Sequence, residues 1–225
     1  QNLKSLLESN VSNIQFETYK YGIFSVISFF IPFLRLRVIH KFSKSLKKLC
    51  NQYPDKKIQI YCHSFGTYIA VKAIESLLKK GKKINLDKLI LSGSVLRSSH
   101  DFSAILDRTD TKIINDCGTV DTILLISEAV VPNTGMAGRV GFYGLNNKRF
   151  VNRYFVGGHS HYFHTKGTFM EKYWLPLFAS EPQLNIIDER SDNWIRNNVV
   201  EYLISTVGKF KEAFYIGAAY YLLIY

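Results

Sequence analysis

The spacing of apolar residues alternates along the chain between the two-residue period of a strand and the longer period of a helix. Short apolar or alternating runs predict strands, and the longer amphipathic runs between them predict helices. The predicted strands are residues 14–21, 58–62, 86–93, 111–115 and 149–156, and the predicted helices are residues 35–51, 65–80 and 121–131. Strands separated by helices are typical of a parallel sheet covered on both faces. The pattern therefore predicts an α/β fold with a mostly parallel sheet flanked by helices on both faces.

Two stretches without a charged residue lie outside this pattern. Residues 21–34 contain Pro32 and fall short of the ~18 apolar residues of a membrane span, so we expect a buried or cap-forming segment, with a place at a membrane interface as the alternative. Residues 213–225 fit either a final core helix or the first part of a membrane helix. We therefore expect one α/β domain over residues 1–208 and a C-terminal apolar helix, or the start of a membrane segment, over residues 209–225.

A glycine-rich stretch at residues 132–144 has glycines at positions 135, 138, 141 and 144. It follows a predicted helix, whereas a dinucleotide-binding fingerprint follows a strand. We expect a loop here.

The charge of the chain is strongly positive. Its 225 residues include 29 Lys and Arg against 18 Asp and Glu, which gives a net charge of +11, and the basic residues concentrate at 35–48 and 79–83. This excess suits an anionic partner such as a membrane surface, although solvated surface lysines give the same pattern. Aromatic residues do not interleave with the basic ones as a base-stacking platform requires, which argues against a nucleic-acid partner.

The three cysteines, Cys50, Cys62 and Cys117, form no Cys-x-x-Cys pair and no Cys/His ligand spacing. This usage is typical of reduced thiols in an intracellular protein. We therefore expect a cytoplasmic location, with membrane association as an open alternative, and neither a metal ion nor a cofactor.

The stretch IQIYCHSFGTYIAVKAIESL, residues 58–77, contains the strongest chemical signal. An apolar strand stops at Cys-His-Ser-Phe-Gly and a helix follows at once, which is the setting of a nucleophilic serine on a sharp turn. Gly66 is the small residue needed after Ser64, and Cys62 meets the same need before it only approximately. The backbone N–H of Phe65 is then a candidate oxyanion donor, because it follows the serine at a helix N-terminus.

A nucleophilic serine needs a base within hydrogen-bond reach and a carboxylate to orient that base. Asp116 and Asp121 follow the predicted strand at 111–115, and His159 and His161 follow the strand at 149–156. Each aspartate has a structural reading, Asp121 as a helix cap and Asp116 as a turn residue. The histidines would also fit a surface or metal-binding cluster. Together, however, the candidates follow the order serine, acid, histidine at the carboxyl ends of strands.

His63 is adjacent to Ser64, and we expect its side chain to point elsewhere. His40 and His100 have no supporting context in the sequence.

The segments YCHSFGT, LILSGSVLR, NDCGTVD and GGHSHYF make the chain resemble an α/β-hydrolase of the serine esterase or lipase type over roughly residues 12–175. The resemblance implies that Ser64 is the nucleophile, Asp121 the acid and His159 the base, with Asp116 and His161 as the alternatives. It implies a serine hydrolase that cleaves a small-molecule or lipid carboxylic ester through an acyl-enzyme. A transferase or thioesterase with the same triad, and a hydrolase-like module without catalysis that binds a membrane or a protein, remain alternatives. The sequence does not indicate an oligomeric state.

The chain departs from the family pattern in two ways. Cys62 replaces the first glycine of the turn, and no His-Gly type loop that would supply the second oxyanion donor precedes Ser64. Because the chain begins with Gln1 rather than Met, we expect it to be a segment of a longer protein whose upstream part contains that loop.

Overall fold

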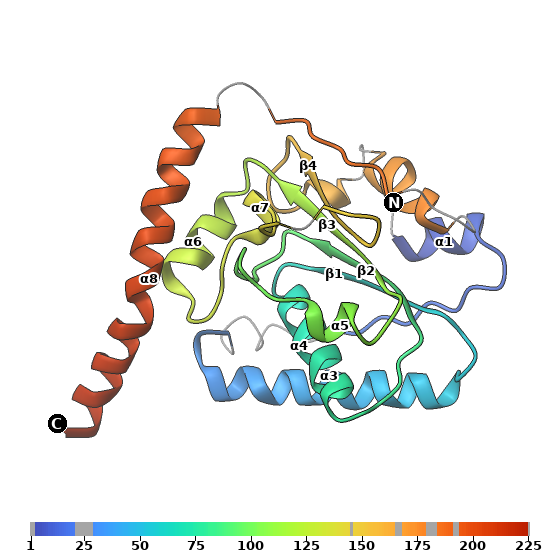
Figure 1. Cartoon of the computed structure of the whole chain (residues 1–225), viewed down its shortest axis with the longest axis horizontal. Coiled ribbons are helices and arrows are strands. Elements are labelled where there is room, and N and C mark those ends of the chain that lie inside the picture. Colours follow the sequence, from blue (N-terminus) through green and yellow to red (C-terminus); the bar gives the residue numbers. More distant parts are fainter. Residues whose placement is uncertain are drawn as a thin grey trace.

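The fold is built on a parallel sheet. The computed structural model describes residues 3–20, 29–144, 146–164, 168–178, 184–190 and 194–224. Its four strands, β1 (Ile58–His63), β2 (Leu86–Ser92), β3 (Lys112–Gly118) and β4 (Phe150–Phe155), lie side by side in chain order (Figure 1). Every neighbouring pair is parallel, so the carboxyl ends of all the strands lie along one edge of the sheet.

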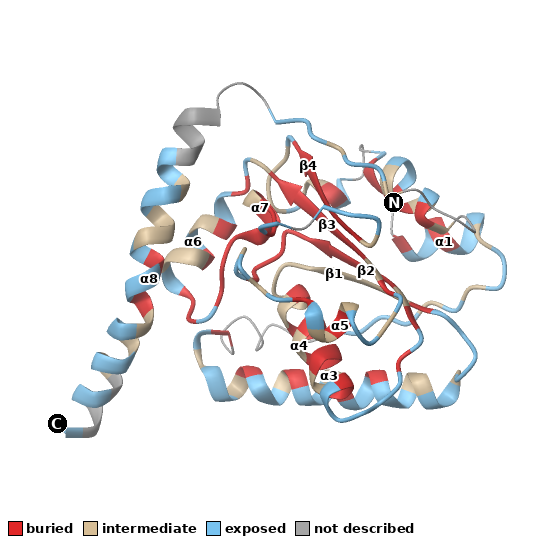
Figure 2. Cartoon of the chain, viewed as in Figure 1, coloured by how far each residue is buried: buried red, intermediate tan, exposed pale blue. Residues whose placement is uncertain are grey.

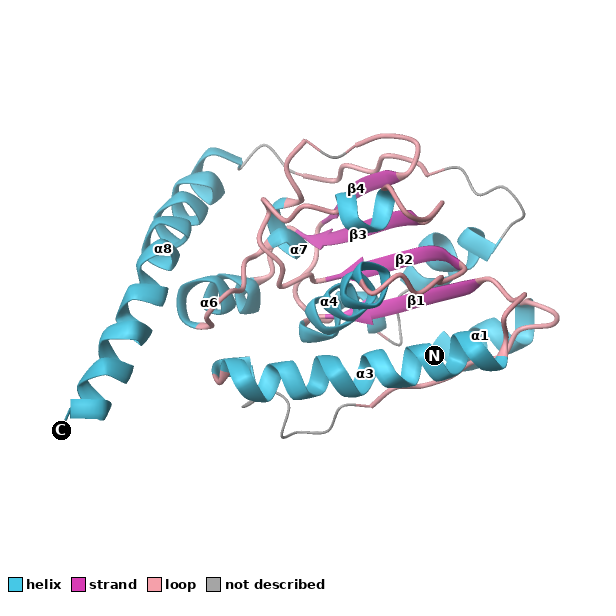
Figure 3. Cartoon of the chain, turned by 60° about the horizontal axis from the view of Figure 1, so that its bottom comes forward, coloured by secondary structure: helices cyan, strands magenta, loops and turns pink. Residues whose placement is uncertain are grey.

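Helices lie on both sides of this sheet (Figure 3). The α-helices are α1 (Leu3–Asn10), α3 (Pro32–Gln52), α4 (Phe65–Lys79), α5 (Ser103–Leu106), α6 (Thr122–Val130), α7 (Ala137–Val140) and α8 (Trp194–Ile224). Three further turns are the 3-10 turns η1 (His161–Phe163) and η3 (Leu175–Phe178) and the single π turn η2 (Met170–Trp174). The parallel sheet with flanking helices confirms the predicted α/β class.

The alternation of side chains along the strands creates two separate cores. Leu89 and Leu91 of β2 face α4 and α5, with α3 packed behind α4. Ile90 of β2 faces α1 and the η2–η3 turns, where Trp174 is fully buried. Figure 2 shows β2, β3 and β4 as mostly buried, whereas most of β1 is intermediate. The sheet is therefore covered on both faces.

The predicted strand at 14–21 is wrong over its described part, because residues 14–20 have no regular structure. Ile14 and Phe16 pack their side chains against the core beside α1 instead of pairing with a neighbouring strand. Alternating apolar residues form a strand only where a partner strand supplies the backbone hydrogen bonds.

The predicted loop at 132–144 contains one helical turn, α7. The segment after β2 holds this turn through two backbone hydrogen bonds. The N–H of Gly135, just before the turn, donates to the carbonyl of Val95 (2.8 Å), and the N–H of Gly138, within the turn, donates to the carbonyl of Ser94 (2.7 Å). A Cβ atom on Gly138 would lie 1.9 Å from the Ser94 nitrogen, so only glycine allows this close approach.

The predicted helix at 35–51 starts earlier, with Pro32 in the first turn of α3, where a proline ring fits the helix. Most of the charge-free segment 21–34 lies outside the described residues, but Phe29 is fully buried against Phe65 and Tyr68.

At the other end of the chain, residues 209–224 belong to α8, which begins at Trp194 and runs through position 208 without a break. Over the residues that the structure describes, no helix is both long enough and apolar enough to cross a bilayer.

A buried ion pair joins β3 and β4. The carboxylate of Asp116 accepts two hydrogen bonds from the guanidinium of Arg153, at 2.6 and 2.8 Å, and a third from the indole N–H of Trp174 at 2.8 Å. All three side chains are buried. This arrangement satisfies the charge of Asp116 inside the protein and fixes η2 against the sheet.

We predict that Asp116→Asn lowers the free energy of unfolding by about 3–5 kcal/mol, because it leaves the buried Arg153 without its counter-charge. Urea denaturation followed by circular dichroism measures the loss. Asp188→Asn is the matched control, since Asp188 pairs with Arg190 at the surface, and we expect it to cost about 1 kcal/mol or less. Equal losses for the two variants would contradict a structural role for the buried pair.

Candidate active site

Ser64 occupies a strained turn between β1 and α4. Its φ of 54° and ψ of −129° lie in a region that residues other than glycine rarely adopt. Hydrogen bonds hold the turn on both sides. The N–H of Ser64 donates to the carbonyl of Ser92 (3.0 Å). The carbonyl of Ser64 accepts from the N–H (3.0 Å) and the hydroxyl (2.6 Å) of Thr67. The strain is therefore compensated by hydrogen bonds from β2 and α4, which leave the side chain of Ser64 at the carboxyl edge of the sheet.

Cys62, the residue in place of the usual glycine, directs its side chain into the core. Its Sγ lies 3.4 Å from the carbonyl of Ile90, and burial raises the pKa of the thiol well above its ordinary value. A protonated thiol that is partly buried against the core behaves as a small apolar group, so Cys62 fits beneath the turn.

The imidazole of His159 faces Ser64. His159 lies in the loop after β4, and its Nε2 is 2.9 Å from the Ser64 Oγ. Its Nδ1 is 2.7 Å from Oδ2 of Asp121. Because a carboxylate only accepts hydrogen bonds, Nδ1 donates to Asp121, and in the neutral ring Nε2 is left to accept the proton of the serine.

Asp121 has two functions in the fold. It caps α6, since its Oδ1 accepts from the N–H of Leu124 at 3.1 Å, and its Oδ2 binds His159. Its side chain is fully buried, and its backbone carbonyl accepts a hydrogen bond from Arg139 (3.2 Å). The helix-cap interpretation and the triad interpretation of Asp121 are thus compatible, because the two carboxylate oxygens have different partners.

The structure does not bring the two alternative residues into this hydrogen-bonded chain. Asp116 is occupied by Arg153 and Trp174, as described above. His161 directs its Nδ1 to the carbonyl of Gly158 (2.7 Å), and burial lowers its pKa. The geometry therefore groups Ser64, His159 and Asp121.

Phe65 is the first residue of α4, so its backbone N–H is one of the helix N-terminal donors that have no acceptor within the helix. Its ring stacks on Phe29 with centroids 4.0 Å apart, which anchors the start of the helix in the core. The role of this N–H as an oxyanion donor stays a prediction, as does a second donor.

His63 is a further residue that contacts the site. Its side chain does not point elsewhere: the Nε2–H donates to the backbone carbonyl of His159 at 2.7 Å, and the two rings have centroids 4.6 Å apart. Gly93, at a φ of 54°, lies next to both rings, where a Cβ atom would be 3.4 Å from each. The adjacency of His63 to Ser64 was the available signal, but its contact with a loop 96 residues away depends on the fold.

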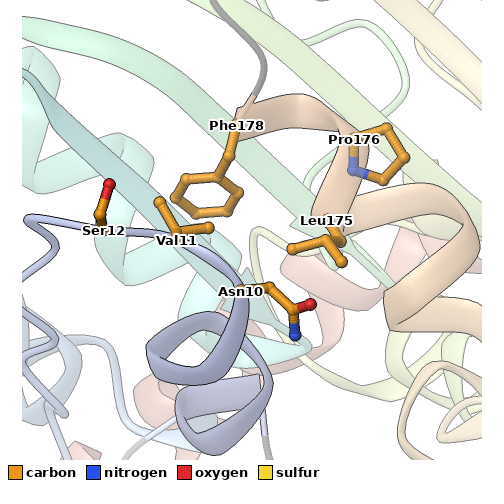
Figure 4. A pocket seen from close by; sticks show the side chains of 6 residues that line it. All are labelled: Asn10, Val11, Ser12, Leu175, Pro176 and Phe178. Carbon is orange, nitrogen blue, oxygen red and sulfur yellow. The ribbon is translucent and has the colours of Figure 1, made fainter.

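A surface pocket of about 420 Å³ lies elsewhere, between the end of α1 and η3 (Figure 4). Asn10, Val11 and Ser12 line one side, and Leu175, Pro176 and Phe178 line the other. None of the residues grouped around Ser64 borders it. Within the described part of the chain, no group of three or more His, Cys, Asp or Glu side chains is placed to hold a metal ion.

We predict that His63 makes stability depend on pH. Burial lowers its pKa from 6.5 to about 4, so the unfolded chain binds a proton in this interval and the folded protein does not. Stability is therefore complete above about pH 6.5 and is lost as the pH falls towards 4, by about 3 kcal/mol in total. Urea denaturation at about pH 7 and about pH 4 measures this loss, and we expect His63→Phe to remove it.

The same substitution at His40, an exposed residue of α3, is the control. If the native chain and His63→Phe lose the same stability between about pH 7 and about pH 4, the folded protein protonates His63 as readily as the unfolded chain does. That result would contradict the prediction.

Comparison with known proteins gives no assignment: no protein-family model, curated protein or solved structure matches this chain. The resemblance to α/β-hydrolases therefore rests on its four sequence segments, and the interpretation of the site rests on geometry.

Proposed function

We propose that the protein is a serine hydrolase of the α/β-hydrolase type that cleaves a carboxylic ester through an acyl-enzyme. The observation that carries this proposal is the continuous hydrogen-bonded chain from the Ser64 Oγ through both nitrogens of His159 to the Asp121 carboxylate. Its two distances, 2.9 and 2.7 Å, are those of an activated nucleophile with an oriented base.

In the first half of the reaction, the Ser64 Oγ attacks the ester carbonyl carbon while His159 Nε2 takes the serine proton. The negative charge that forms on the carbonyl oxygen is stabilised by the N–H of Phe65. His159 then protonates the leaving alcohol as the ester C–O bond breaks, which leaves the acyl group on Ser64. Asp121 stabilises the imidazolium in both steps without taking a proton.

In the second half, a water molecule replaces the alcohol. His159 Nε2 removes a proton from this water, which attacks the acyl carbon, and the proton passes to Ser64 as the acid product leaves. His159 can serve in both halves because its Nδ1–H remains bound to Asp121 and fixes the ring.

Two further features support the assignment. The strained backbone of Ser64 is typical of a nucleophile elbow, in which a sharp strand-to-helix turn exposes the serine above the sheet. The three residues also occur in the order Ser, Asp, His after β1, β3 and β4, which is the order expected of this type of enzyme.

We predict that a fluorophosphonate probe labels the native protein at Ser64 and that Ser64→Ala abolishes both labelling and ester hydrolysis. The expected fall in kcat is about 10⁶-fold, since the nucleophile is removed. Ser160→Ala is the matched control, because Ser160 is an exposed serine next to His159. Absence of labelling in the native chain, in a form that includes any upstream loop, would favour the binding module without catalysis.

We predict that Asp121→Asn lowers kcat by about 10⁴-fold, because a neutral amide can stabilise neither the required tautomer nor the imidazolium. Asparagine caps helices as well as aspartate does, so α6 and the thermal midpoint should be nearly unchanged. Steady-state hydrolysis of acyl esters of graded chain length, together with a thermal melt, separates the two effects. A variant that retains native kcat would exclude Asp121 as the acid.

A further inference from the structure

The helix α8 packs on the protein with its polar side and turns its apolar side outward. It lies against α6 and extends past the body of the protein (Figure 1). Helices at a protein surface usually do the opposite and bury their apolar stripe. This inversion needs a physical explanation.

The inner side of α8 is held by polar contacts. Glu201 accepts a hydrogen bond from Arg139 (2.7 Å), and Lys211, which is buried, donates to the backbone carbonyls of Glu128 and Thr134. Glu212 accepts from Arg97 and from the N–H of Asn133. These contacts fix which side of the helix faces the protein.

The outer side of α8 is apolar and aromatic. It includes Tyr202, Leu203, Val207, Phe210, Phe214 and Tyr220, each between 58% and 73% exposed. With 3.6 residues per turn, this outer face covers roughly half of the circumference of the helix. Figure 2 shows the exposed residues along the whole described length of α8. A contiguous exposed apolar surface of this kind marks an interaction site.

The charges on α8 determine which partner suits this face. Glu201 and Glu212 are the only acidic residues in the sequence of the helix, and both are bound to arginines of the body. Lys209, which is exposed beside Phe210, adds a positive charge to the outer face. The chain as a whole carries +11. The outer face therefore presents apolar groups and positive charge with no carboxylate, which is complementary to an anionic lipid surface.

We propose that the outer face of α8 docks on a lipid surface rich in anionic headgroups, with the helix lying in the plane of the interface. Its tyrosines have the amphipathic character that places such rings at headgroup depth. A second copy of the chain is the competing occupant. A helix pair needs only a narrow apolar seam flanked by charged residues, however, whereas this face is apolar over roughly half the helix.

This proposal does not rest on the proposed hydrolysis, but one residue, Arg139, contacts both α8 and the candidate active site. Arg139 binds Glu201 of α8 through its Nε and the backbone carbonyl of Asp121 through its Nη1. The docking helix is thus one side chain away from the candidate acid.

Flotation with phospholipid vesicles tests the proposal. The native chain and Ser64→Ala are mixed with vesicles of phosphatidylcholine alone, or of phosphatidylcholine and phosphatidylserine in equal amounts, at low and high salt. We expect both proteins to bind the mixed vesicles better, and added salt to weaken this preference. Because Ser64→Ala removes the proposed nucleophile but leaves α8 unchanged, we expect it to bind vesicles as well as the native chain does. Failure of docking and failure of hydrolysis can then be told apart.

The variants Phe210→Gln and Phe214→Gln should each lower the partition coefficient about tenfold, because each removes a large apolar group from the face. Lys209→Gln should lower binding to the mixed vesicles alone, about fivefold. Tyr143→Gln, on the loop after α7, is the matched control, because Tyr143 is 69% exposed, as is Phe210. Circular dichroism verifies that each variant retains its helix.

Three outcomes would overturn the proposal. The first is the absence of vesicle binding by the native chain, and the second is binding that the two phenylalanine substitutions leave unchanged. The third is a dimer in sedimentation analysis that these substitutions dissociate while vesicle binding persists, which would assign the outer face of α8 to a second copy.

Discussion

The buried carboxylate of Asp116 holds together the edge of the sheet on which the candidate site is built. It binds Arg153 of the neighbouring strand and Trp174 of η2. The backbone carbonyl of the same residue accepts from the hydroxyl of Tyr162 (2.9 Å) and the N–H of Gly93 (3.2 Å). One residue thus connects the ends of β2, β3 and β4 with the loop that carries His159. The strained turn at Ser64 can face a histidine from a distant loop because this edge is held rigidly.

The sequence predicts those parts of the fold that depend on local pattern. The strands after residue 57, the helices α4 and α6 and the turn at Ser64 follow from the period of apolar residues and from small residues at the turn. The choice between Asp116 and Asp121 could not be made in this way, since both follow the strand predicted at 111–115 and only the structure places Asp116 inside β3. It depends on Arg153 and Trp174, which lie 37 and 58 residues further along the chain. The position of His63 and the failure of residues 14–20 to form a strand depend equally on long-range partners.

The helix α8 shows the same limit at a larger scale. The charge-free residues at the end of the chain indicate an apolar segment, but not a helix that starts at Trp194. Its orientation is set by a few polar groups of the body, among them Arg139 and the carbonyl of Thr134. Buried polar contacts are directional, whereas apolar contacts are not, so a small number of them can decide which side of a helix faces the protein.

The order of the strands has a consequence for synthesis of the protein. Because β1 to β4 are neighbours in the order in which they leave the ribosome, each new strand can pair with the one before it. His159 follows the last strand, and Trp174 emerges later still. A nascent chain that ends before these residues has Ser64 and Asp121 but neither the base between them nor the indole that secures Asp116. The chemistry that we propose for Ser64 therefore cannot begin before the last strand of the sheet and His159 have been synthesised.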